Sequence, residues 1–272
     1  MRRNPTLVLG LAMVAVVVAL ALLSVVWTPW PATQVGPQRL LPPSGEHLMG
    51  TDGFGQDIFS RILIGARSCL LVGVVAVGIG ASLGVPLGIV AAVNRRWLGR
   101  LIMRSTDILY AFPALLLAIL LAAARGSGST TTAMAAIGIA SVPAFARVAR
   151  GAAIQVLSQD YILAARSAGI GRIGIASHHV LPNIIPVVLV QASVSFGLAI
   201  LAEASLSYLG LGTPPTVPTW GRMIFESKPY LYSDPNLALW PGLFIALAVL
   251  GFNLLGDGMR ELLDPTLREL ER

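Results

Sequence analysis

The chain has 272 residues, of which 55% are hydrophobic and only 12% are charged, and its mean hydropathy is +0.77. An ordinary soluble domain carries about 25% charged residues, so this composition excludes a soluble globular protein. Cys69 is the single cysteine, which excludes an internal disulfide and a cysteine-based metal cluster. The net charge of +6 comes from basic residues spread over several short loops, which argues against a nucleic-acid-binding patch.

Six uncharged apolar runs follow one another along the chain, each near the roughly 17–25 residues that cross a bilayer as a helix. They cover 7–27, 69–93, 108–124, 130–146, 184–202 and 237–256. We therefore expect an all-α membrane protein with about six transmembrane helices. The first run stays apolar through Val26 and is longer than a signal-peptide core, so segment 1–28 is expected to remain as a membrane anchor.

The basic residues fall into two groups when the six runs are taken as spans. The larger group shares a side with both termini, and the positive-inside tendency makes that side cytoplasmic. This group contains Arg2, Arg3, Arg95, Arg96, Arg100, Arg104, Arg147, Arg150, Arg166, Arg172, Arg260, Arg268 and Arg272. The outward group contains Arg39, Arg61, Arg67, Arg125, Arg222 and Lys228.

After the first span, segment 29–66 is expected to lie outside the membrane. Its first part is rich in Pro and Gly and predicts a loop, in which His47 has no evident partner. From Asp57 the apolar residues recur at helical spacing, while Asp57 and Arg61 lie four residues apart on the other face. This pattern predicts an interfacial helix that leads into a five-helix core over 67–260.

The second span carries Gly80, Gly84 and Gly88 at four-residue intervals. Small residues with this spacing let two membrane helices approach closely, so the pattern favours helix packing, with a pore-lining role as the alternative. Pro86 interrupts the same span. Pro113 and Pro143 are expected to be tolerated kinks in the third and fourth spans, because neighbouring groups can satisfy the freed carbonyls.

The longest cytoplasmic segment includes 158–182 and contains GIGRIG, the spacing of a dinucleotide-binding loop. That motif requires a preceding strand and an acidic residue about 20 positions later, and neither is present. The glycines Gly169, Gly171 and Gly174 are instead expected to end a short helix that Ser158 or Asp160 caps. Small residues on that exposed helix indicate a docking site; they are Ala164, Ala165, Ala168 and Gly169.

A second long outer segment, 210–236, is rich in Pro and Gly and is expected to form a shaped lid that includes Trp220 and Gly221. Glu203, at the outer end of the fifth span, would either hold that helix against the lid or face the substrate path. An aromatic belt at the outer boundary would comprise Trp27, Trp30, Tyr208, Trp220 and Trp240. Asp107 is expected to pair locally with Arg104.

Catalytic constellations and an internal energy source are both missing from the sequence. There is no HExxH motif, Asp257 has no second intramembrane aspartate, and His178 and His179 are adjacent and diverge on a helix. Buried acidic relays and an internal repeat, which an ion-coupled transporter would need, are not apparent. The chain is therefore either a passive channel or carrier, an embedded enzyme or scaffold, or a subunit powered by a partner on the cytoplasmic side.

The stretch AARSAGIGRIGIASHHVLPN resembles the cytoplasmic "EAA" loop of bacterial ABC-importer permeases. The residues that carry the resemblance, together with Asp160 as a coupling candidate, are Ala164, Ala165, Gly169, Leu181 and Pro182. Three further stretches narrow it to the second permease of dipeptide, oligopeptide and nickel importers: GTDGFGQDIFSRILIGARSCL, AEASLSYLGLGTPPTVPTWGRM and WPGLFIALAVLGFNLLGDGMRELLDPTLR. One departure is Leu163, at a position that is usually acidic in the family.

This resemblance implies a type I importer permease in a bacterial inner membrane, with both termini and the tail 261–272 in the cytoplasm. The implied partners are a second homologous permease, two ATPase subunits that bind ATP and Mg, and an extracytoplasmic substrate-binding protein, with no cofactor bound by this chain. The mechanism implied is alternating access driven through the 158–182 loop. The substrate stays open among dipeptides, oligopeptides, nickel, haem and glutathione.

Overall fold

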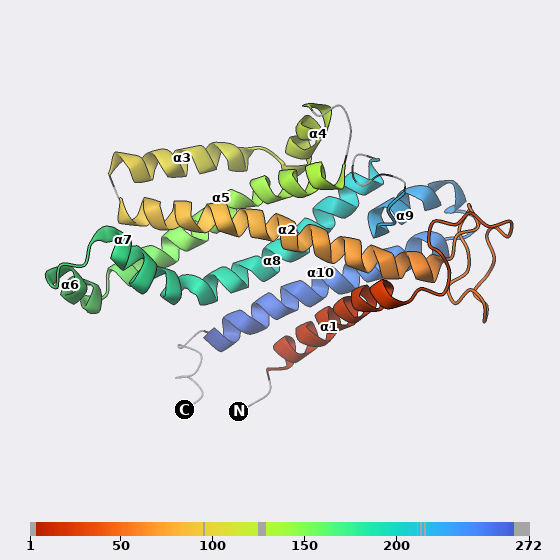
Figure 1. Ribbon diagram of the computed structural model, residues 1–272, viewed down its shortest axis with the longest axis horizontal. Helices are drawn as coiled ribbons and strands as arrows, with labels where there is room; N and C mark the ends of the chain where they lie inside the picture. Colours follow the sequence, from red (N-terminus) through yellow and green to blue (C-terminus); the bar gives the residue numbers. More distant parts are fainter. Residues whose placement is uncertain are drawn as a thin grey trace.

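A computed structural model describes residues 4–94, 96–124, 129–210, 212, 214 and 216–263, and every regular element among them is a helix (Figure 1). The helices are α1 (Pro5–Val26), α2 (Ile58–Val93), α3 (Trp97–Ala111), α4 (Ala114–Ala124), α5 (Thr130–Leu157), α6 (Asp160–Ser167), α7 (Arg172–Gly174), a π-helix (Ile175–Val180), α8 (Leu181–Tyr208), α9 (Trp220–Ser227), a 3-10 turn (Lys228–Tyr230) and α10 (Asn236–Leu263).

Five of these helices are long and apolar enough to cross a membrane, and α3 with α4 makes a sixth span if the bent pair counts as one. The third run was expected to be one kinked helix, and this expectation is wrong. Helix α3 ends at Ala111, Phe112 is extended with φ −83° and ψ 120°, and α4 leaves at an angle of 88°. Pro113 is the cause, because proline offers no N–H and disfavours helical backbone in the residue before it.

Helix α2 is continuous over 36 residues, about 54 Å at 1.5 Å per residue. The interfacial helix expected over 58–66 is therefore the beginning of the second span itself. Asp57 caps α2 by accepting a hydrogen bond from the Ser60 amide. Pro86 lies inside α2 and Pro143 inside α5 without ending either helix.

The interface between α2 and α5 depends on the three glycines spaced four residues apart. A Cβ at Gly80 would meet the Ser141 hydroxyl, one at Gly84 would lie 2.6 Å from the Val142 carbonyl oxygen, and one at Gly88 would reach the Ala146 carbonyl oxygen. The two backbones are thus in direct van der Waals contact. A similar close approach joins α1 to α10, where Gly10 faces the backbone of Leu254 and Leu255.

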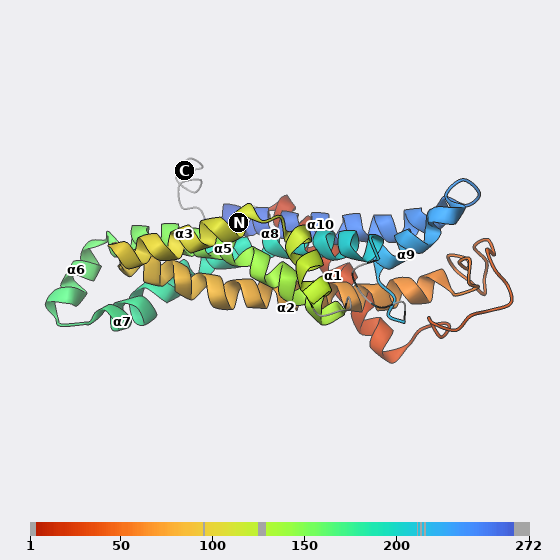
Figure 2. The same ribbon diagram turned by 90° about the horizontal axis from the view of Figure 1, so that it is seen from above.

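The first and last described residues lie at the same end of the molecule, because the Asn4 amide donates to the Glu261 carboxylate at 2.7 Å. Helices α6 and α7 project beyond the bundle at that end, and the loops around α9 form the opposite end (Figures 1 and 2). Several predictions fall outside the described residues: those on Arg2, Arg3, Arg95, Arg125, Arg268, Arg272, the tail beyond Leu263, and lid positions 211, 213 and 215.

Candidate coupling surface, translocation face and outer lid

Helix α6 begins without a side-chain cap. Its N-cap residue is Gln159, which makes no capping hydrogen bond, so the expectation that Ser158 or Asp160 caps the helix is wrong. Ser158 belongs to the end of α5, where its hydroxyl donates to the Gln155 carbonyl at 2.7 Å. Asp160 is the first residue of α6, where a negative charge interacts favourably with the amide end of the helix.

The other end of α6 closes in a Schellman motif. Gly169 has φ +83°, the Gly169 amide donates to the Arg166 carbonyl at 3.0 Å, and the Ile170 amide donates to the Ala165 carbonyl at 3.1 Å. This pair of bonds requires a left-handed residue, which glycine supplies without a Cβ penalty. Gly169 therefore ends a helix, as expected, and GIGRIG lies between helices and not after a strand.

One face of α6 is turned into the molecule. Ile162 is completely buried and Ala165 is 9% exposed, while Tyr161, Leu163 and Ala164 lie on the solvent side. Ala165 was expected to be a docking residue, and the structure contradicts this because its side chain packs inward. Ala164 is the alanine of the pair that a partner can reach.

The tip of the molecule carries several exposed apolar side chains. Leu163 is 56% exposed and Ile173 is 86% exposed. The ring of Tyr161 lies 6.2 Å from that of His179 in the π-helix, so α6 lies beside the residues that lead into α8. We name the exposed set the coupling surface; it comprises Tyr161, Leu163, Ala164, Ile170, Ile173, Leu181 and Pro182. Contiguous exposed apolar side chains mark interaction sites in soluble parts of proteins.

A second feature is a partly open cavity of about 190 Å³ that is lined by α2, α3, α5 and α8. Its walls are mostly small or apolar, with polar groups supplied by Tyr110, Ser141, Gln191 and Ser195. The Gln191 amide donates to the Ser195 hydroxyl at 3.0 Å. Sequence reasoning missed these residues because it searched the spans for ionisable groups, although a glutamine inside the apolar run 184–202 was a visible signal.

An ion pair lies beside this cavity. The Arg147 guanidinium is 3.2 Å from the Asp107 carboxylate and stacks 4.6 Å from the centre of the Tyr110 ring. The expected local pair between Asp107 and Arg104 is therefore wrong, because the partner comes from α5 and not from the same helix. Both side chains are at least half exposed, so the pair contributes little stability.

At the end of the molecule opposite the coupling surface, helix α9 packs against two spans, α2 and α8. Trp220 is 2% exposed, its indole N–H donates to the Ile62 carbonyl at 3.1 Å, and its ring occupies the space beside Gly65. A Cβ at Gly221 would collide with the backbone of Ala204 in α8. Trp220 is thus a core residue and not the member of an aromatic belt that the sequence suggested.

Glu203 joins α8 to the beginning of α9. Its carboxylate accepts a hydrogen bond from the Ser207 hydroxyl at 2.6 Å and another from Thr219, and the side chain is only 4% exposed. Thr219 also caps α9 by accepting from the Arg222 amide. This geometry corresponds to the first of the two expected roles for Glu203, that of holding the lid.

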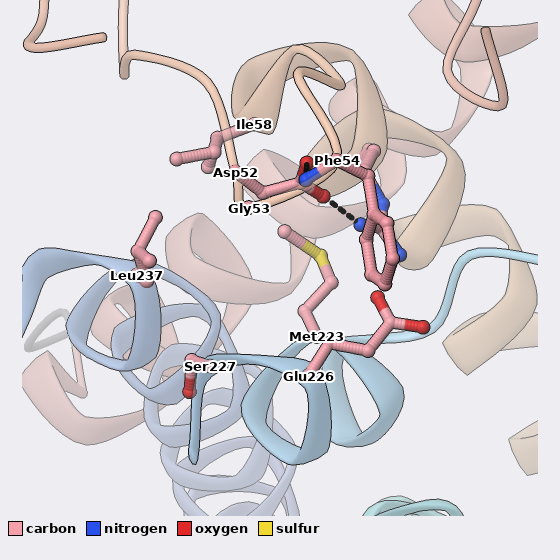
Figure 3. A pocket seen from close by; sticks show the side chains of 9 residues that line it. Asp52, Gly53, Phe54, Ile58, Met223, Glu226, Ser227 and Leu237 are labelled. Atoms are coloured by element: carbon pink, nitrogen blue, oxygen red, sulfur yellow. Dashed lines mark hydrogen bonds and ion pairs between the residues drawn. The ribbon is translucent and has the colours of Figure 1, made fainter. Parts of the chain in front are cut away.

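Three ion pairs near this contact were not expected; Figure 3 shows the cavity beside them, with Asp52 and Glu226 in its wall. Arg61 is 2% exposed and pairs with Asp52 of the outer loop and, at 2.7 Å, with Glu226 of α9. Arg222 also contacts Glu226, at 2.8 Å. We name Arg61, Asp52 and Glu226 the outer cluster; it borders a cavity of about 20 Å³, which is room for about one water.

The outer cluster and its surroundings correct two expectations. Arg61 does not lie on an outward polar face with Asp57. His47, which had no evident partner in the sequence, has its Nδ1 atom 2.8 Å from the Asp57 carboxylate and stacks on Trp30 with ring centres 5.0 Å apart. The outer loop is therefore tied to the start of α2 both at Asp57 and at Arg61.

The chain forms a multi-pass helical bundle with an apolar tip, a cavity lined by a few polar side chains and a fixed lid at the other end. These features together are typical of the membrane subunit of a transporter. The chain belongs to the family described as the binding-protein-dependent transport system inner membrane component, whose family model matches residues 84–269.

Known relatives and solved structures agree with this family. The chain is 40% identical over 269 residues to the dipeptide transport system permease protein DppC of Alkalihalophilus pseudofirmus, covering 98% of this chain and 88% of the relative. It is 44% identical over 226 residues to the glutathione transport system permease protein GsiD of Pectobacterium atrosepticum, covering 83% and 75%. An inward-facing structure of the MetNI methionine ABC transporter superposes with a TM-score of 0.61 at 18% identity, covering 76% of this chain and 95% of that chain, so the fold is that of an ABC-importer permease.

Proposed function

We propose that this chain is the permease subunit of an ATP-driven, binding-protein-dependent importer of short peptides, and that it forms half of the translocation pathway. The observation that carries the proposal is the coupling surface, a protruding short helix with outward small and apolar side chains and a rigid glycine end. The relatives named for dipeptide and glutathione transport favour a short peptide as substrate.

The coupling surface would receive its force from an ATPase subunit that binds ATP and Mg. A partner can shift the inward and outward states only through contacts that differ between them. Leu163 and Ala164 present apolar contact area to that partner. The exposed Leu163 suits a hydrophobic contact at the position where the family usually places an acidic side chain, so the ATPase groove facing it should be apolar.

The remaining surfaces would receive the other subunits. The cavity between α2, α3, α5 and α8 would face the second permease, with Gln191 and Ser195 offering hydrogen bonds to a passing peptide backbone. The outer loop and α9 would meet the substrate-binding protein, so they would lie outside the cell membrane, with both termini in the cytoplasm.

Reconstitution in proteoliposomes tests the proposal. Peptide uptake is expected only when this chain is combined with a homologous permease, two ATPase subunits, a binding protein and ATP. Uptake by this chain alone along an ion gradient would favour a carrier and contradict the proposal. Radiolabelled dipeptide, glutathione, nickel and haem offered in parallel would identify the substrate, and uptake of nickel or haem without peptide would make the peptide assignment wrong.

A further inference from the structure

A second cavity, of about 590 Å³, lies at the same end of the molecule as the coupling surface but on its bundle side. It is partly open to the surface and is lined by the end of α2, the beginning of α3, the end of α5, α6 and α7, which lie together in Figure 1. Its volume falls within the range of about 300–1,000 Å³ that is typical of ligand sites. The side chains that carry charge or hydrogen-bonding groups in its wall are those of Asn94, Arg96, Trp97, Arg166 and Arg172.

All the charged side chains that line this cavity are positive. Three guanidinium groups line it, no carboxylate does, and none of the three forms an ion pair with a described residue. The carbonyl ends of α2 and α5 supply roughly half a negative charge each, and the amide end of α3 offsets one of them. Roughly two to three positive charges therefore remain uncompensated, which favours a bound anion.

The arginines are positioned for such a ligand. The Arg172 guanidinium donates to the side-chain oxygen of Asn94 at 3.2 Å, which ties α7 to the end of α2. Arg166 follows the buried Ile162 by one helical turn, so it projects from the bundle side of α6. One guanidinium group can donate two parallel hydrogen bonds to two oxygens of a phosphate. Arginines are therefore common in protein sites that bind phosphate groups.

The surroundings identify the source of the phosphate as a lipid. The apolar run of α2 ends at Val93, and Trp97, at the mouth of the cavity, is 67% exposed. An exposed tryptophan beside arginines at the end of a span is typical of the headgroup level of a bilayer. Leu98 and Leu101 are also exposed along α3 and offer apolar contact to acyl chains.

From these observations we propose that the cavity binds the phosphate headgroup of an anionic phospholipid of the cytoplasmic leaflet. Basic pockets between membrane helices on the cytoplasmic side bind such headgroups. The bound lipid would connect α6 and α7 with the α2–α3 turn, and thereby fix the base of the coupling surface. The proposal does not rest on the substrate or on ATP coupling, so its failure would leave the proposed function unaffected.

Native mass spectrometry of the intact transporter, equilibrated in detergent with phosphatidylglycerol and phosphatidylcholine, tests the site. The wild-type complex is expected to retain phosphatidylglycerol preferentially. Arg172→Gln should lower that affinity about fivefold, since one arginine near an anionic surface has an effect of this size. Arg100→Gln is the matched control, because Arg100 is exposed on α3 but does not line the cavity, and it should leave the affinity unchanged.

Several results would overturn the proposal. One is equal retention of the two lipids by the wild-type complex, and another is an equal loss in Arg172→Gln and Arg100→Gln. Displacement by inorganic phosphate without any lipid preference would assign the cavity to a free anion. Loss of the ATPase subunits from Arg172→Gln with unchanged lipid occupancy would assign the arginines to the ATPase interface. If Arg172→Gln does not assemble, Arg96→Gln, on the α3 side of the cavity, provides the same test.

Discussion

The sharpest prediction concerns Gly169, which closes α6. Its φ of +83° lies in the left-handed region, where a residue with a Cβ costs about 1–2 kcal/mol. A Cβ built at Gly169 would meet no atom within 4 Å, so the substitution Gly169→Ala acts through the backbone alone. At about 1.4 kcal/mol per factor of ten, this cost shifts the helix end roughly 5- to 30-fold toward other conformations.

Gly171 provides a matched control on the same loop. Its φ of −70° is accessible to any residue, and its Cβ would also meet open space, so Gly171→Ala should carry no such cost. Gly169→Asn should be intermediate, because asparagine tolerates the left-handed region better than alanine does.

The assay is the number of peptides imported per ATP hydrolysed in proteoliposomes. Gly169→Ala should keep ATP hydrolysis and membrane insertion but lower the ratio several-fold, whereas Gly171→Ala should keep the wild-type ratio. An unchanged ratio in Gly169→Ala, or an equal fall in both variants, would refute the reasoning that the rigid helix end transmits force.

Three further predictions follow from side-chain positions. Ala164→Cys should crosslink to a cysteine in the ATPase groove and Ala165→Cys should not, because only the first side chain faces outward; equal crosslinking would contradict the assigned faces. Gly84→Val should destabilise the bundle by about 1–3 kcal/mol in thermal unfolding, whereas Gly78→Val, whose Cβ meets no atom within 4 Å, should not; similar melting temperatures would show that the α2–α5 contact can relax. Trp220→Ala should cost about 3–5 kcal/mol and raise hydrogen exchange in α9, and unchanged protection there would mean that other contacts hold the lid.

The spacing of apolar residues predicted most of the fold, but it did not predict that the third span is broken between α3 and α4. Pro86, Pro143, Pro186 and Pro241 lie inside membrane-spanning helices without ending them, whereas Pro113 lies where α3 ends. Pro86 and Pro143 belong to the closely packed α2 and α5, where neighbouring groups can satisfy freed carbonyls. Tyr110 and Phe112, next to Pro113, are about half exposed, so that segment lacks such neighbours. The sequence alone does not state which prolines will have packed surroundings.

The residues of the candidate site could be predicted where the pattern that identifies them lies among residues close together in the sequence. The glycine end of α6 follows from three consecutive small residues, and even the inward phase of Ala165 was readable from Ile162, three residues earlier. The outer cluster was not predictable in this way. Glu226 is separated from Arg61 by 165 residues, and periodicity placed Arg61 on a solvated face because it carries no information about a distant partner.

The long second helix connects the two functional ends. At its outer end α2 carries Arg61 in the outer cluster and offers the Ile62 carbonyl to Trp220. At its inner end it packs on α5 through Gly88 and positions Asn94 beside Arg172. The helix is continuous over about 54 Å, so we expect a displacement of its inner end to reach its outer end unless α2 bends at Pro86.

Under the proposed function, the energy for that displacement would arrive through contacts at the tip. Among the described residues, Glu203 is the one carboxylate buried within a span, and its oxygens are engaged by Ser207 and Thr219 in holding α9. A proton or ion relay through the bundle would need further buried ionisable groups near the midplane, and that part of the chain offers Gln191 and Ser195 instead. Under the proposed function, these neutral groups would hydrogen-bond to a passing peptide, and the coupling surface would receive the energy for transport from the ATPase subunits.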